Sequence, residues 1–205
     1  MTINEIKVEA LRSMAVNLEE DIRAEDYEAL LAVDKYASYL VNMTGAINRC
    51  LSVFERRRVL PLKKAVLSGG AARGGCLAFD LAQIRDLYDI AYIVYDGDLG
   101  YDRSVAFIKE ASEVLIPFPM GGTYTAVYYP TVPRVKESDG EVDIGLPEGL
   151  ACLVPLAIKV ELLAPEDPDS AALARSQFET ALAEIMSENR VTPSFVVSIY
   201  GGEML

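Results

Sequence analysis

Apolar residues recur at helical spacing near both ends of this chain and gather in short runs through its middle. The clearest pattern spans residues 146–184, where two helical segments are joined by an acidic connection. One face of the first segment is apolar up to its final position and consists of Leu150, Leu153, Val154, Ala157, Val160 and Glu161. Steps of three or four residues place side chains on one side of an α-helix. We therefore predict a helical hairpin that packs against another part of the molecule.

The second helix of this hairpin has a clear start. Asp167 is a favourable N-cap, and Pro168 suits the first helical position because that position needs no amide hydrogen. Asp169 lies near the positive end of the helix dipole. Apolar residues then recur at helical spacing, at Ala171, Ala174, Phe178, Ala181, Leu182 and Ile185. The pattern predicts a helix with one buried face.

Further helices are predicted in the N-terminal part. Thr2 and Glu5 form a capping-box pattern ahead of a short amphipathic helix, and the acid-rich residues 19–34 favour a brief second one. The next helix is marked by Tyr36, Leu40, Met43, Ile47, Cys50, Leu51 and Phe54. It ends in cations that suit the negative helix end, Arg56, Arg57 and Arg58, and Val59, Leu60 and Pro61 stop it.

From Leu62 to Pro130 the pattern is typical of strands. Short apolar runs are separated by Gly, Asp and Pro clusters, and they span residues 65–67, 76–79, 90–95, 105–108, 114–118 and 124–129. This spacing predicts a small antiparallel β sandwich or barrel. A last apolar run, Phe195–Tyr200, favours a terminal strand that pairs with this sheet or with a neighbouring subunit.

The order of these elements predicts the fold class, which is α+β. We expect residues 1–61 and 146–190 to form one helical bundle. Residues 62–145 would interrupt that bundle as a β insertion domain, and residues 191–205 would form a C-terminal strand or tail. The chain would then have two lobes.

Charge and composition remove several classes of function. The chain has 19 basic and 31 acidic residues, a net charge of −12, which disfavours wrapping nucleic acid on a basic surface. It contains no histidine, so imidazole zinc sites, the usual triads and histidine acid-base catalysis are excluded. Catalysis would have to rest on carboxylates, Lys or Tyr.

Cysteine usage and hydropathy indicate the setting. Cys50, Cys76 and Cys152 are odd in number and lie in apolar or helical contexts, as reduced, buried thiols do, so we expect an intracellular environment. No leader pattern is seen, and the longest apolar run, residues 150–158, is too short for a membrane span. A mean hydropathy of +0.19 is high for a soluble monomer and predicts subunit contacts.

Three segments are candidates for chemistry, and each has a simpler interpretation. The glycines around Arg73 in Ser68–Gly75 suggest an anion loop, but a hairpin tip is favoured. Asp96, Asp98 and Asp102 suggest a calcium loop, but these are also ordinary turn residues. The run Arg56–Arg58 would contact an acidic partner or phosphate, or would only cap its helix.

The chain resembles the adaptor proteins of tailed bacteriophages, the head-to-tail connectors, including tail tubular relatives in which a β domain interrupts the bundle. The resemblance rests on YLVNMTGAINRCLSVFERRRVLP, residues 39–61, on YYPTVPRV, residues 128–135, and on an ending with LP, an apolar helix, EDP and AAxxxxxFExALAEI. It covers nearly the whole chain in organisation, and its motifs are diffuse helical patterns. The loop SGGAARGG matches no family signature.

The resemblance implies a virion protein, made in the bacterial host cytoplasm by a phage or prophage, that is not an enzyme and needs no cofactor or metal. It implies a ring, commonly dodecameric, that docks beneath the portal protein and contacts a downstream tail or nozzle protein. Arg56, Arg57, Arg58 and Arg73 are the candidate partner contacts. DNA would pass through without specific binding, and the acidic balance suits such a channel, although solubility explains it equally well. The alternative is a small-ligand or metal-binding enzyme with a carboxylate site between the lobes.

Overall fold

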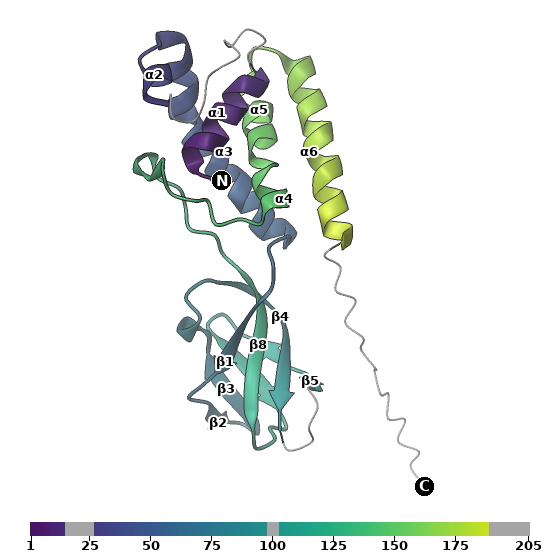
Figure 1. Cartoon of the computed structure of the whole chain (residues 1–205). Helices are drawn as coiled ribbons and strands as arrows, with labels where there is room; N and C mark the ends of the chain where they lie inside the picture. Colours follow the sequence, from purple (N-terminus) through teal and green to yellow (C-terminus); the bar gives the residue numbers. More distant parts are fainter. Residues whose placement is uncertain (15–26, 98–102, 189–205) are drawn as a thin grey trace.

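In the described residues, helices precede and follow a middle region of strands (Figure 1). The computed structural model describes residues 1–14, 27–97 and 103–188. The helices are α1 (Ile3–Met14), α2 (Tyr27–Leu31), α3 (Asp34–Arg57), α4 (Glu148–Ala151), α5 (Val154–Leu163) and α6 (Pro168–Glu188), with 3-10 turns η2 (Leu81–Gln83) and η3 (Glu137–Asp139). The fold is mixed α+β, as the sequence predicts.

Helix α1 begins at the predicted capping box. The Thr2 amide donates to the Glu5 carboxylate at 2.7 Å, and the Glu5 amide donates to the Thr2 hydroxyl at 3.2 Å. These bonds satisfy two amide groups that have no partner within the helix. Of the acid-rich stretch, residues 27–31 form α2, and residues 15–26 lie outside the described residues.

Helix α3 has the predicted apolar pattern and ends at Arg57, within the predicted run of arginines. Its buried residues recur at the expected positions, Leu40, Met43, Ile47, Cys50, Leu51 and Phe54. Arg58 adopts a left-handed conformation with φ 55° and ψ 40°, and its amide donates to the Glu55 carbonyl at 3.0 Å. The Val59 amide then reaches the Phe54 carbonyl at 3.2 Å. This closing turn resembles other helix ends that use a left-handed residue.

The first helix of the predicted C-terminal hairpin is broken in two, contrary to expectation. Helix α4 ends at Ala151, and α5 starts at Val154. Pro155 explains the break, because proline has no amide hydrogen and its ring excludes the carbonyl four residues earlier, here that of Ala151. The break changes the buried face. Ile158 is fully buried, whereas the predicted Ala157, Val160 and Glu161 are only half-buried.

Helix α6 starts as predicted. The Asp167 carboxylate accepts the Ser170 amide at 3.1 Å, which is the bond of an N-cap. The buried residues on its inner face are Ala171, Ala174, Phe178 and Leu182, and Ala181 and Ile185 are partly buried against the same cluster. The phenyl rings of Phe178 and Phe54 stack with their centres 6.3 Å apart, so α6 packs directly on α3.

The strands form two antiparallel sheets of four strands each. One has the order β1-β8-β4-β5 and the other β2-β3-β7-β6. Their bounds are β1 (Lys63–Leu67), β2 (Ala71–Arg73), β3 (Cys76–Asp80), β4 (Leu87–Asp96), β5 (Arg103–Val105), β6 (Ile108–Lys109), β7 (Glu113–Pro117) and β8 (Thr123–Pro130). In the described residues neither sheet closes on itself, so the barrel alternative is wrong. The antiparallel pairing is as predicted.

Two details of the strand prediction are corrected. The run 105–108 is not one strand, because β5 ends at Val105 and β6 in the other sheet begins at Ile108. The chain changes sheets between them. Strand β2 lies inside the segment predicted as a hairpin tip, and its three residues are exposed, so no apolar pattern marks it.

The buried side chains form two clusters. One joins α1, α3, α5 and α6 with the connection that follows β8, through Val135 and Ile144. The other joins the apolar faces of both sheets, with Phe79 and Val114 from one sheet and Ile93 and Tyr124 from the other. The helices gather at one end of the molecule in Figure 1 and the strands at the other, and the connections after α3 and β8 run between them.

Two other predictions concern the C-terminal residues and membrane-spanning segments. The predicted terminal strand Phe195–Tyr200 and the tail 191–205 lie outside the described residues. Among the helices of the described part, none is both long enough and apolar enough to cross a membrane.

Candidate partner-contact surfaces

The three arginines at the end of α3 are exposed, and two of them bind acids of the same chain. The Arg57 guanidinium lies 3.5 Å from the Glu179 carboxylate of α6. Arg58 lies 2.6 Å from Asp89 of β4 and 5.6 Å from the centre of the Tyr129 ring. Arg56 donates to the Ser52 carbonyl one turn earlier at 3.3 Å. Arg57 and Arg58 thus link α3 to other elements, and exposed pairs of this kind contribute under about 1 kcal/mol each.

Arg73 lies on a separate hairpin, far along the chain from this group. Its guanidinium is 2.9 Å from Glu113 and 3.7 Å from Glu110. Gly74 and Gly75 connect β2 to β3 with φ values of 57° and 82°, the two positive values that a tight I′ hairpin turn requires. The end of the segment Ser68–Gly75 is therefore a hairpin turn, as favoured from the sequence, and β2 precedes it. Two carboxylates beside Arg73 make it a poor anion site.

The candidate calcium loop is mostly outside the described residues. Asp98 and Asp102 belong to residues 98–102, and only Asp96 of the three aspartates is described. Within the described part of the chain, no group of three or more Cys, Asp or Glu side chains is arranged to hold a metal ion. The loop with Asp98 and Asp102 therefore lies outside the described residues, and the calcium-loop alternative stays a prediction.

A polar clamp that sequence analysis missed holds the connection after β8 against α3. Asn48 donates its amide to the Val135 carbonyl at 2.9 Å and accepts the Val135 amide at 2.8 Å. The Glu55 carboxylate, only 5% exposed, accepts the Val132 amide at 2.9 Å and the Arg134 guanidinium at 2.6 Å. Asn48 and Glu55 are two helical turns apart. A polar pair at that spacing, next to an apolar helix face, is the signal that would have identified it.

Charged groups also surround the start of the strand region. Asp86 accepts hydrogen bonds from the Lys63 ammonium at 2.7 Å and the Tyr128 hydroxyl at 2.8 Å. The bond from Lys63 is the main reason that the pKa of Asp86 lies below its usual value. Burial, together with the bond to Asp86, raises the pKa of Tyr128 to about 12. These groups brace β1 and β8 where they leave the helices.

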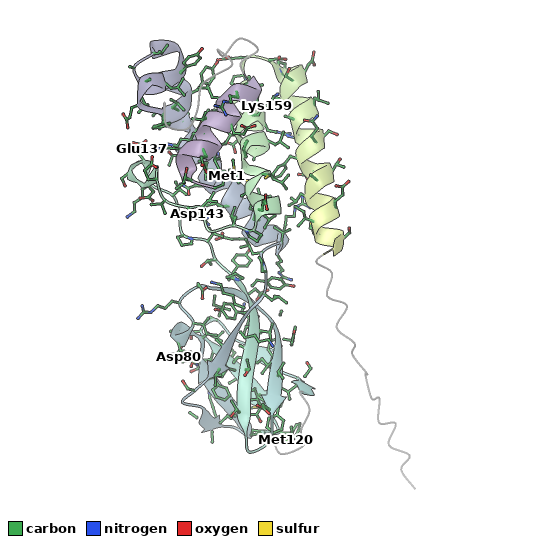
Figure 2. The ribbon with its side chains drawn as sticks, in the orientation of Figure 1. Met1, Asp80, Met120, Glu137, Asp143 and Lys159 are labelled. Carbon is green, nitrogen blue, oxygen red and sulfur yellow. The ribbon has the colours of Figure 1, made fainter. Side chains whose placement is uncertain are left out.

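An apolar groove lies beside this connection, and we call it the junction groove. Its volume is about 550 Å³, and its apolar lining comes mainly from Leu60, Pro61, Pro130, Val132, Ile144 and Leu146. The charged residues that line it cancel formally, with Lys63 and Arg134 against Asp139 and Asp143. Asp143 also binds the Met1 amino group at 2.7 Å, and Figure 2 shows these two residues together on the helical side.

The loop between β7 and β8, residues 118–122, forms the second apolar surface, which we call the tip loop. Phe118 is 91% exposed, the highest value among the large apolar side chains of the described residues, and Met120 is 38% exposed. Met120 is labelled in Figure 2 at the end of the strand region opposite to the helices. The sequence predicts Phe118 at the end of the strand run 114–118, but β7 ends at Pro117 and Phe118 begins the loop.

Two buried tyrosines hold the tip loop through hydrogen bonds to its backbone. The Tyr124 hydroxyl accepts the Met120 amide at 2.8 Å and donates to the Met120 carbonyl at 2.9 Å. The Tyr95 hydroxyl donates to the Gly121 carbonyl at 2.6 Å. The rings of Tyr95 and Tyr124 contact each other at 5.3 Å inside the strand cluster. The exposed Phe118 therefore stands on a loop that the core holds in place.

The remaining reactive side chains of the described residues lie in different environments. Lys7 is 2% exposed, burial lowers its pKa, and its ammonium donates to the Tyr27 hydroxyl at 3.3 Å. Of the cysteines, Cys50 is buried, Cys76 is half-buried and Cys152 is exposed, so the expectation of buried thiols holds for Cys50 alone.

No protein-family model matches the chain, and no curated protein matches it at a significant level.

Proposed function

We propose that this protein is a structural subunit of a tailed-phage virion, which forms a ring beneath the portal and extends the DNA channel towards the tail. The observation that supports the proposal is that the C-terminal helices pack against the N-terminal helices. Helix α5 packs against α1, α3 and α6, and all four contribute to one buried cluster. The strands lie between these helices in the chain but bury their own cluster.

We propose that the N- and C-terminal helices form one bundle, which a β domain interrupts in the chain. Residues 1–61 and 146–190 would form the bundle, and residues 62–145 the insertion domain. The clamp of Asn48 and Glu55 supports it, because a connection held to α3 fixes the direction in which the strands leave the helices. A ring subunit needs such a fixed direction, since small errors in the rotation between copies prevent closure.

The charges and apolar surfaces are compatible with this role. A net charge of −12 gives a channel wall that repels the DNA backbone and lets it slide. The exposed Arg56 offers a contact for acidic groups of the portal or of a neighbouring subunit, and Arg73 would do so only while also keeping its internal acids Glu110 and Glu113. Arg57 and Arg58 would serve the same contacts while keeping their internal acids. The function needs no enzyme activity and no cofactor.

The test is assembly. The purified protein, alone and mixed with the portal protein encoded nearest to its gene, is imaged by negative-stain electron microscopy and sized by light scattering. We expect rings, or collars bound to one end of the portal. A protein that stays monomeric and never binds portal at any concentration contradicts the proposal. Addition of calcium, magnesium or manganese is expected to leave the melting temperature unchanged, because a metal enzyme would be stabilised by its ion.

A further inference from the structure

The backbone of Phe118 is strained as well as exposed. Its φ of 51° is in the left-handed region, where a bulky residue is rarely found. Nothing in the strand cluster requires a phenyl ring there, because the side chain is 91% exposed. Asn or Gly would adopt this conformation with less strain. An aromatic ring kept in water on a braced and strained loop is a feature of contact sites, where rigid aromatic side chains contribute most of the binding energy.

The chain itself carries a surface that fits such a ring. The junction groove has a volume of about 550 Å³ and a largely apolar lining. A dry cavity of about 150 Å³ is enough to bind benzene, so the groove has room for a phenyl ring and for Met120 beside it. The groove and the tip loop lie at opposite ends of the strand region, as the positions of Asp143 and Met120 in Figure 2 show. One chain therefore cannot bring them together.

Charge favours a second copy as the occupant of the groove. Two copies with a net charge of −12 repel each other, and contact regions without net charge add no like-charge pairs to that repulsion. Residues 116–124, which include the tip loop, contain no charged residue. The charges that line the groove cancel, with Lys63 and Arg134 against Asp139 and Asp143. The tip loop and the junction groove are thus both largely apolar. Neither carries a net charge, although the whole molecule is acidic.

We propose that the tip loop of one copy inserts Phe118 into the junction groove of the next copy. The two surfaces differ, so the contact is heterologous, and its repetition closes into a ring when the rotation between copies permits. The inference rests on the proposed function in that it names the contact that would join the ring subunits. It also predicts that strain at Phe118 is retained for association rather than for folding.

The first test replaces the aromatic side chain. Phe118→Asn is expected to weaken self-association by about 30-fold or more, as for a contact that dominates an interface. The melting temperature of the dissociated chain should stay the same or rise by a few degrees, because Asn tolerates the backbone conformation. Association is measured by analytical ultracentrifugation and melting by circular dichroism. A lower melting temperature, or unchanged association, overturns the inference.

Leu173→Gln is the matched control. Leu173 is 62% exposed on α6, outside both surfaces, and glutamine has nearly the same helix propensity as leucine. This variant removes a similar apolar side chain and is expected to associate like the parent. Loss of association in Leu173→Gln, with Phe118→Asn unaffected, would move the contact to α6 and overturn the inference.

Cross-linking tests the pairing directly, in a Cys76→Ser, Cys152→Ser background that keeps only the buried Cys50. Met120→Cys on the tip loop is combined with Val142→Cys, which lines the groove and is 55% exposed. A short bis-maleimide should link copies into a ladder, whereas Met120→Cys with Leu173→Cys should not. If rings form without this ladder, the contact is elsewhere and only the inference fails. If no assembly forms with or without portal, the proposed function fails, and the inference fails with it.

Discussion

Single side chains of the same type have different environments in this molecule, and the cysteines show it most clearly. Burial raises the pKa of the Cys50 thiol to about 12, well above the usual value of about 8.5. Cys152, at the end of α4, is exposed. Because the thiolate is the reactive form, burial makes Cys50 both inaccessible and unreactive. The sequence alone placed both in apolar or helical settings and did not separate them.

We therefore expect the two thiols to differ in labelling. At pH 8, a maleimide should modify Cys152 in the folded protein within minutes and Cys50 only when denaturant unfolds the chain. Peptide mass spectrometry reads out both sites in the same sample. Fast labelling of Cys50 under native conditions would show that the helical cluster is more open than described.

The carboxylate of Asp86 makes stability depend on pH. Its pKa is lowered in the folded state, chiefly by the hydrogen bond from Lys63. A lowered pKa stabilises the folded protein above the unfolded value of about 3.9, and this contribution is lost as the pH falls through the folded value. Asp86→Asn should therefore lower the melting temperature at pH 7. The difference in melting temperature from the parent should shrink below about pH 4. It should disappear once Asp86 is protonated in both the folded and the unfolded chain.

A Lys63→Met variant provides the matching control for this prediction. It removes the ammonium that lowers the pKa of Asp86 and keeps most of the side-chain volume. Thermal melts at several pH values are expected to show a similar loss at pH 7, with little further loss when both substitutions are combined. Additive losses would show that the two groups act separately.

At the scale of elements, helix ends are decided by local bonds, and α6 is an example. Its first turn depends on the Asp167 carboxylate, which accepts the Ser170 amide at 3.1 Å. The sequence predicts this cap because Asp, Pro and a following apolar pattern are adjacent in the chain. Local chemistry also explains why α4 and α5 are separate, although the apolar pattern hid the break at Pro155.

Removal of the α6 cap should weaken the helix without disrupting the fold. Asp167→Ala is expected to lower the melting temperature by about 2–4 °C, the usual effect of losing one cap in a chain of this size. Asp167→Asn keeps an acceptor and should cost less. Circular dichroism melts compare the variants, and equal losses for Ala and Asn would show that charge, rather than the cap bond, is responsible.

The strands were less completely predicted, for a physical reason. Strand β2 is exposed at all three residues, so its backbone pairing with β3 leaves no apolar alternation to detect. The passage from β5 to β6 changes sheets within a run that looks continuous. In both cases the structure is decided by which strand lies alongside, and a neighbour distant in the chain does not show in the local sequence.

At the scale of the whole molecule, the clamp between α3 and the connection after β8 joins two segments that are far apart in the chain. Glu55 is the buried member of this clamp and accepts from Val132 and Arg134. Glu55→Ala should lower the free energy of unfolding by about 2–3 kcal/mol, because a buried amide and a guanidinium lose a charged acceptor. Urea denaturation measures the loss. The half-exposed Arg134 can turn to water, which keeps the cost from being larger.

Glu55→Gln is the control, since it retains one oxygen for the Val132 amide. It should cost less than half as much as Glu55→Ala. If the clamp also sets the direction of the strand region, Glu55→Ala should reduce ring formation more than its stability predicts. Equal ring yields for the parent and both variants would show that other contacts hold the connection.

The sequence by itself determined the elements whose causes are local. The capping box of α1, the cap of α6, the apolar face of α3 and the Gly74–Gly75 turn each depend on residues within a few positions of one another. The absence of histidine and the acidic balance likewise follow from composition alone. Such features can be predicted because their free energies arise within one turn of the chain.

Only the tertiary structure decided which surfaces are available for contact. Arg57, Arg58 and Arg73 were candidates for external contacts, and the fold placed internal carboxylates beside them. The junction groove joins residues from three distant segments, and the tip loop is exposed because two tyrosines of the strand cluster hold it outward. Exposure and partners of a side chain depend on chain segments far away in sequence, so no local pattern specifies them.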